Sequence, residues 1–69
     1  NAFIMEFKVF DERKEKDLAQ TAANALRQIE EKQYEADMIA AGIPGERICK
    51  LGFAFEGKEV MVVKEKHRQ

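Results

Sequence analysis

The segment Phe3-Ile-Met-Glu-Phe-Lys-Val-Phe10 constrains the fold most, because it predicts a β-strand with two different faces. Successive side chains of a strand point to opposite sides, so alternate residues share a face. One face carries Phe3, Met5, Phe7 and Val9, and the other carries Ile4, Glu6, Lys8 and Phe10. The pattern therefore predicts a buried strand on which a single carboxylate and a single amine, Glu6 and Lys8, are neighbours.

The size and composition of the chain limit what this strand can belong to. With 69 residues the chain is at most one small domain, and a domain of that size removes only about 60% of its unfolded surface from water. Hydrophobic residues make up 45% and charged residues 36% of the chain, which predicts a soluble globular protein. No apolar run approaches the roughly 20 residues that a membrane span needs.

Charge and cysteine content limit the binding partners and the cellular compartment that we expect. The net charge is −1, so the chain has no overall positive field for nucleic acid, and any such contact must be local. The single cysteine, Cys49, excludes an internal disulfide and fits a reducing cytoplasm. Because Asn1 stands almost directly before a strong strand, we expect the chain to be a fragment of a longer protein.

A long helix is predicted after a charged connection at residues 11–17. Asp17 followed by Gln20 has the form of an N-terminal cap, so the helix is expected to begin near Leu18. Apolar residues recur at helical spacing, and Ala22 and Ala25 are small enough for close approach to a sheet. Helical character continues to residue 41, with a bend near Gln33 compatible with the pattern, and Gly42 and Pro44 end it.

A second β region is predicted at residues 45–55, where Gly52 and Ala54 leave one face small for close packing. Residues 56–58 form the turn of a hairpin whose returning strand spans residues 59–64, and the end of the chain is expected to fray. The order predicts an α/β fold with a small mixed βαββ sheet. Its first two strands are parallel and the hairpin adds an antiparallel strand.

Glu6 and Lys8 are the candidates for chemistry. A carboxylate can hold a hard cation, while an ammonium two residues along the same face can orient a water molecule or stabilise charge on a phosphoryl group. Taken alone, Glu-x-Lys also describes an ordinary ion pair that contributes little to stability. The wider sequence context decides between these interpretations.

That context is an ordered set of motifs: the Glu-x-Lys strand, Ala25-Leu-Arg-Gln-Ile-Glu-Glu-Lys-Gln-Tyr34, and Leu51-Gly-Phe-Ala-Phe55. The set spans residues 2–63 and resembles the C-terminal nuclease-like domain of a bacterial family that joins an AAA-type ATPase-like region to a PD-(D/E)XK nuclease domain. The resemblance implies a partial restriction-endonuclease-like core in which residues 1–69 are the C-terminal half of the nuclease domain.

The same resemblance assigns roles. It implies Glu6 as a ligand of Mg²⁺, Lys8 as the catalytic amine and Gln28 as a residue that orders the site, with a structural role for Tyr34. It also implies DNA as the substrate of the parent protein and the ATPase-like region as a partner in the same chain.

One departure from the superfamily pattern bears on activity. The superfamily also uses an Asp on the preceding strand, and this chain has no such strand before Asn1. A single carboxylate is a poor site for Mg²⁺, so the chain by itself is expected to be inactive. Two hypotheses stay open: a truncated Mg²⁺-dependent nuclease domain, or a non-catalytic binding or self-association module with the same fold.

A homo-oligomer formed through exposed edge strands is expected in either case, with Glu6 and Lys8 near the interface. The remaining candidates have simpler interpretations. His67 lies in a basic tail and is expected to be solvated, and Cys49 is expected to be a small core residue. Gly42-Ile-Pro-Gly45 is predicted to be a turn, because it lacks the Gly-Lys-Ser/Thr ending of a phosphate loop.

Overall fold

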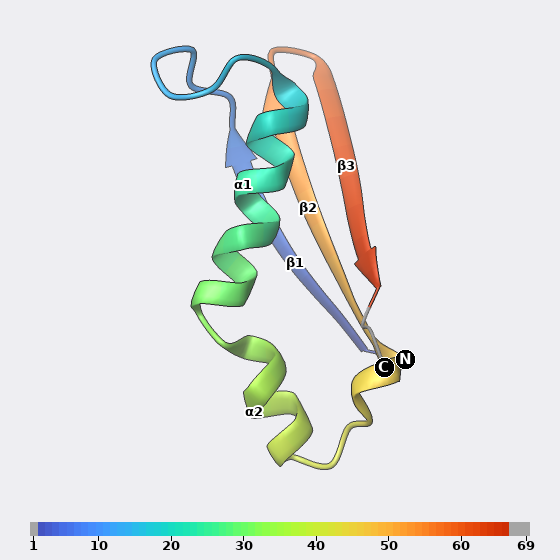
Figure 1. Cartoon of the computed structure of the whole chain (residues 1–69). Helices are drawn as coiled ribbons and strands as arrows, with labels where there is room; N and C mark the ends of the chain where they lie inside the picture. The colour runs from blue at the N-terminus through green and yellow to red at the C-terminus, as the bar shows by residue number, and fades with distance from the viewer. Residues whose placement is uncertain (1, 67–69) are drawn as a thin grey trace.

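The computed structural model describes residues 2–66. The elements follow one another as β1 (Ala2–Val9), α1 (Leu18–Glu31), α2 (Tyr34–Ala40), a 3₁₀ turn (Gly45–Arg47), β2 (Ile48–Glu56) and β3 (Glu59–Lys66). The three strands form one sheet in the order β1-β2-β3, and α1 crosses in front of it (Figure 1). This is the predicted α/β architecture, a small mixed sheet consistent with part of a restriction-endonuclease-like fold.

The strand pairing confirms the predicted βαββ topology. β1 and β2 are parallel, with Glu6 opposite Gly52 and Lys8 opposite Ala54. β2 and β3 are antiparallel and are joined by a tight turn in which Gly57 has a φ of 58°, a conformation that glycine adopts without steric cost. The helices therefore form the crossover between two parallel neighbours, as a parallel pair requires.

The helix begins where its cap predicts and is interrupted after Glu31. The Asp17 carboxylate accepts a hydrogen bond from the backbone N–H of Gln20 at 2.9 Å. The Gln20 side chain reaches one residue further back than expected and accepts from the N–H of Lys16 at 2.6 Å. At Gln33 the backbone turns left-handed, with a φ of 58°. The compatible bend near Gln33 is thus a complete break that separates α1 from α2.

The core lies between α1 and the face of the sheet that we call the inner face. This face is formed by Ile4, Glu6 and Lys8 of β1 and by Ile48, Lys50, Gly52 and Ala54 of β2. Ile4, Ile29 and Ile48 are buried together, and the small residues Ala22, Ala25 and Ala54 are completely buried. A Cβ atom on Gly52 would lie 2.5 Å from the carbonyl oxygen of Ala22, so α1 sits almost directly on the backbone of β2.

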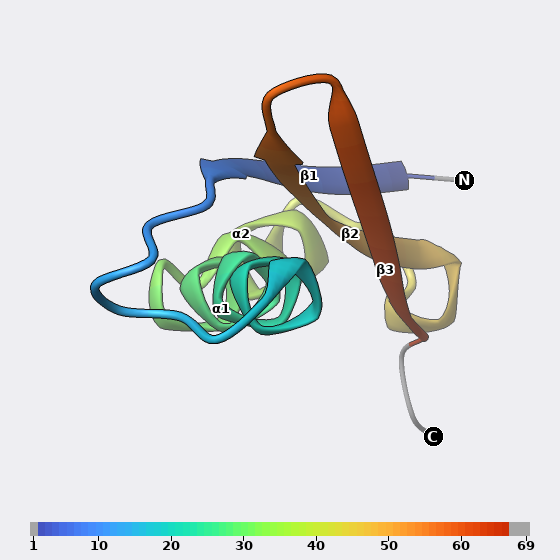
Figure 2. The same ribbon diagram turned by 90° about the horizontal axis from the view of Figure 1, so that it is seen from above.

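The opposite, outer face of the sheet is uncovered by the described residues. Figure 2 shows both helices on one side of the sheet. The outer face carries Phe3, Met5, Phe7 and Val9, which are 49–74% exposed, together with Leu51, Phe53, Phe55, Val60 and Val62. The Phe7 ring stacks on Phe53 at 4.8 Å and lies 6.1 Å from Phe55. The prediction of a buried strand is therefore wrong for one face of β1, because helices cover the inner face only.

The structure also differs from the sequence-based predictions in the bounds of two strands and in the position of Cys49. The second β region begins with a 3₁₀ turn, so β2 starts at Ile48, and β3 continues to Lys66 where fraying was expected from residue 64. Cys49 is half-buried on the outer face and is not a core residue. His67 lies outside the described residues. Within residues 2–66, no helix is long and apolar enough to cross a membrane.

Candidate functional site

Glu6 and Lys8 lie on the inner face of β1, as the alternation predicts, and both are half-buried. Their cross-strand partners on β2 are the smallest residues available, Gly52 and Ala54. No bulky side chain of β2 therefore stands beside them. The two charged groups face the end of α1 and the connection between β1 and α1, which supply their polar surroundings.

The Glu6 carboxylate forms an ion pair with Lys32. The Lys32 Nζ atom lies 3.5 Å from Glu6 Oε2, with the Glu6 side chain 19% and the Lys32 side chain 48% exposed. Lys32 directly follows α1, and its ammonium also lies 5.9 Å from the centre of the Tyr34 ring. Glu6 is thus paired with an amine from the helix end, and not with its strand neighbour Lys8.

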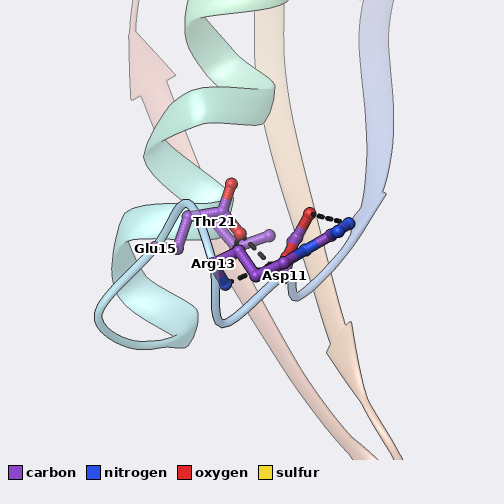
Figure 3. A network of polar contacts seen from close by, with 4 residues as sticks. All are labelled: Asp11, Arg13, Glu15 and Thr21. Carbon is purple, nitrogen blue, oxygen red and sulfur yellow. Dashed lines mark hydrogen bonds and ion pairs between the residues drawn. The ribbon is translucent and has the colours of Figure 1, made fainter.

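The connection between β1 and α1 is organised by the carboxylate of Glu15 (Figure 3). Glu15 Oε1 accepts hydrogen bonds from the Asp11 N–H at 2.9 Å and from the Thr21 hydroxyl at 3.0 Å. Glu15 Oε2 accepts from the Asn24 side-chain amide at 3.1 Å. Asp11 in turn binds the Arg13 side chain at 3.2 Å. These bonds fix an otherwise charged connection against the first turns of α1.

The pKa values of these two carboxyl groups are lowered. For Glu15 the hydrogen bond from the Asp11 N–H is the largest cause, and the bonds from Asn24 and Thr21 and the charge of Lys8 add to it against the opposing effect of burial. For Asp11 the pKa is lowered first by the hydrogen bonds with Arg13, and the charge of Lys8 contributes weakly. The charge of Lys8 is thus the smallest contribution to either shift, and hydrogen bonds within the connection dominate.

Gln28 occupies the side of α1 that faces these groups, without bonding to them. It is half-buried and lies one helical turn from Asn24 and one from Lys32. Asn24 contacts Glu15 near Lys8, and Lys32 contacts Glu6, so Gln28 lies between the two ends of the site. Within the described part of the chain, no polar contact joins the Gln28 side chain to Glu6 or Lys8.

Sequence reasoning missed a second polar cluster on the inner face. Lys50 is only 5% exposed, and its ammonium lies 2.7 Å from Glu30 and 2.6 Å from Glu35. Burial lowers the pKa of this lysine, but the hydrogen bonds with the two carboxylates outweigh burial and raise the pKa overall. The signal was available: Lys50 precedes Gly52 by two residues and must share its face.

The described residues do not fit a Mg²⁺ site by themselves. No group of three or more His, Cys, Asp or Glu side chains that could hold a metal ion occurs among residues 2–66. The charged group bound to the Glu6 carboxylate is an ammonium, whereas Mg²⁺ takes carboxylates and waters in octahedral geometry. An open hollow of about 610 Å³ lies elsewhere, at the end of β1, between Val9–Arg13 and the β2–β3 turn.

Comparison with known protein families identifies the superfamily to which the chain belongs. A model of the PD-(D/E)XK nuclease superfamily matches residues 1–65, which include the Glu-x-Lys strand, α1 and the β2–β3 hairpin. The chain belongs to the PD-(D/E)XK nuclease superfamily. No curated protein and no solved structure matches it.

Proposed function

We propose that this chain forms the C-terminal half of a nuclease domain that hydrolyses phosphodiester bonds of DNA. The observation that carries the proposal is the placement of Glu6 and Lys8 on the inner face of β1, opposite Gly52 and Ala54, in a chain of this superfamily. Because these partners are small, the backbone of α1 packs directly against β2 beside the two groups. The match with the superfamily supports a nuclease-like function.

In this proposal the three residues have distinct tasks. The Lys8 ammonium would hold the attacking water or offset negative charge that develops on the phosphoryl oxygens. Gln28, between Asn24 and Lys32 on α1, would orient polar groups at the site. Glu6 would be the carboxylate that this half contributes to binding Mg²⁺, the cofactor that we propose. We propose that the remainder of the domain supplies a second carboxylate, because residues 2–66 contain no group of three or more side chains that could hold a metal ion.

The setting of the parent protein is part of the same proposal. We propose a cytoplasmic protein in which an AAA-type ATPase-like region accompanies the nuclease domain. Both features rest on the resemblance of the three ordered motifs, and neither follows from the geometry of residues 2–66. The net charge of −1 gives no overall positive field, so we propose local DNA contacts near Glu6 and Lys8.

The test is cleavage of DNA by the chain extended with the remainder of the domain, in the presence of Mg²⁺. Separate Glu6→Ala and Lys8→Ala substitutions should each lower the cleavage rate by about 100-fold or more, because each removes a charged group at the reacting phosphate. Glu46→Ala, which changes an exposed carboxylate at the 3₁₀ turn, is the matched control. Robust cleavage by the Glu6 and Lys8 variants would contradict the proposal.

A second candidate function is a non-catalytic self-association module. The observation that favours it is the uncovered outer face, where Phe3, Phe7 and Val9 are more than half exposed. Large exposed apolar patches mark interaction surfaces. In this alternative the extended domain would lack Mg²⁺-dependent cleavage, while association of the chain would be unchanged by Glu6→Ala and Lys8→Ala.

A further inference from the structure

The position beside the Glu6 carboxylate is already taken by a positive charge from the chain itself. The Lys32 ammonium lies 3.5 Å from Glu6 Oε2. Mg²⁺ would bind such an oxygen at about 2.1 Å and would bring its own waters. A hydrated divalent cation and the ammonium would then compete for the same side of the carboxylate, both by volume and by like charge.

The local backbone holds Lys32 in this place. Its N–H caps α1 by donating to the carbonyl oxygen of Gln28 at 3.0 Å. The next residue, Gln33, has a φ of 58°, a region that non-glycine residues adopt at a cost. This turn starts α2, which puts the Tyr34 ring under the ammonium and the Glu35 carboxylate 2.6 Å from Lys50. The helix break therefore directs Lys32 toward Glu6 and Glu35 toward Lys50.

We propose that Lys32 is the built-in counter-ion of Glu6, which occupies the cation position at this carboxylate and opposes binding of a divalent cation there. This role explains how the negative charge of Glu6 is compensated on the inner face although the described residues offer no further ligands for a metal ion there. It also assigns Lys32 as a positioning residue of the site, one that holds the Glu6 side chain toward α1. The inference rests on the proposed function for the role of the Glu6 carboxylate in cation binding.

The experiment is titration of the ¹⁵N-labelled chain with Mn²⁺ without DNA, with paramagnetic broadening of the β1 amide signals as the readout. In Lys32→Met, the signals next to Glu6 should broaden at Mn²⁺ concentrations up to about fivefold lower than in the unchanged chain, a modest factor because the pair is partly exposed. Lys32→Arg keeps the charge and should behave like the unchanged chain. Glu6→Gln in the Lys32→Met background should remove the broadening.

Controls separate a local effect from a change in net charge. Lys58→Met removes the same charge at the β2–β3 turn and should leave the broadening near Glu6 unchanged. The amide spectrum in the absence of Mn²⁺ checks that each variant is folded, and Lys32→Gln serves if Lys32→Met is not. Equal broadening near Glu6 with and without the Lys32 amine would overturn the inference, as would broadening that persists in the Glu6→Gln double variant.

The outcome is distinguishable from that of the nuclease test. Mn²⁺ binding is measured on the chain alone, whereas cleavage needs the extended domain. If Lys32→Met changes Mn²⁺ binding but the extended domain does not cleave DNA, the counter-ion role stands and the nuclease proposal fails. If cleavage depends on Glu6 but Mn²⁺ binding ignores Lys32, the nuclease proposal stands and the counter-ion role fails.

Discussion

At the residue scale, Gly52 shows how closely α1 approaches the sheet. A Cβ atom there would meet the Ala22 carbonyl oxygen at 2.5 Å and the Leu26 nitrogen at 3.1 Å. Both are helix backbone atoms, which cannot move aside as a side chain can. Because Gly52 lies opposite Glu6, the contact that fixes the core also sets the distance between the helix and the candidate site.

Gly52→Ala should therefore destabilise the chain by about 1–3 kcal/mol, through overpacking of a tight contact. Gly57→Ala is the matched control. That position meets no atom within 4 Å but has a φ of 58°, so it should cost about 1 kcal/mol from backbone strain alone. Urea unfolding measures both values. A Gly52 variant no less stable than the Gly57 variant would show that the helix can lift off the sheet without cost.

A second residue-scale prediction concerns Glu15 and acid. The folded-state pKa values of Glu15 and Asp11 lie below their unfolded values of 4.5 and 3.8. Their contribution to stability is therefore complete above the unfolded values and is lost as the pH falls through the lower folded values. The melting temperature should accordingly fall between about pH 5 and pH 2.

Glu15→Gln tests the source of this dependence, because an amide has one acceptor oxygen where the carboxylate has two. The variant should melt several degrees lower at neutral pH and should lose less of its stability on acidification. Glu12→Gln, which alters an exposed residue of the same connection, should follow the unchanged chain. Parallel melting curves for the Glu15 variant and the unchanged chain across the pH range would contradict the assignment.

At the scale of elements, α2 depends on the ion pairs of Lys50. None of its residues is buried, and a seven-residue helix is too short to be stable alone. Its polar link to the sheet is Glu35, which meets the buried Lys50 ammonium at 2.6 Å, beside the contact of Lys50 with Glu30 of α1 at 2.7 Å. Its apolar link is Met38, which packs against the core cluster. Lys50 thus joins both helices to β2.

Glu35→Gln should therefore loosen α2 while leaving α1 in place. We expect amide hydrogen exchange in residues 34–40 to become about tenfold faster, equivalent to about 1.4 kcal/mol of local opening. Glu31→Gln removes the same charge from an exposed position at the end of α1 and is the control. Unchanged exchange in α2 would mean that the partly buried Met38 and Ile43 hold the helix without the ion pair.

The elements were predictable because each has a strong local signal. Period-two alternation marks β1, the Asp17 cap starts α1, and small residues mark the contact at Gly52 and Ala54. The sequence allowed a bend at Gln33 but did not predict a break, because neither Gly nor Pro stands there. The ion pairs of Lys32 and Glu35 on either side of Gln33 are contacts between distant segments, which the local sequence does not reveal. Pairing of Glu6 with Lys32 was not predictable either, because it depends on where the helix ends in space.

At the scale of the whole molecule, the two faces of the sheet are unequal. The inner face carries the charged residues Glu6, Lys8 and Lys50 on β1 and β2, with Glu65 of β3 opposite Lys50, and α1 covers it. The outer face is mostly aliphatic and aromatic and is uncovered by the described residues. β1 is also an edge strand, because the sheet order is β1-β2-β3. One edge of its backbone and one apolar face are thus both available for contact.

We propose that the isolated chain self-associates through β1 and the outer face, which would cover the aromatic group of Phe7, Phe53 and Phe55. Light scattering should show an average mass that rises with protein concentration. Phe7→Lys places a charge in the centre of the face, where Phe7 is 58% exposed, and should shift the chain toward monomer. Ile39→Lys changes an apolar residue on α2 that is 47% exposed and should leave the mass unchanged. A strictly monomeric mass at high concentration, with slow exchange of the amides in residues 3–10, would show that the edge and face of β1 are protected within a single copy.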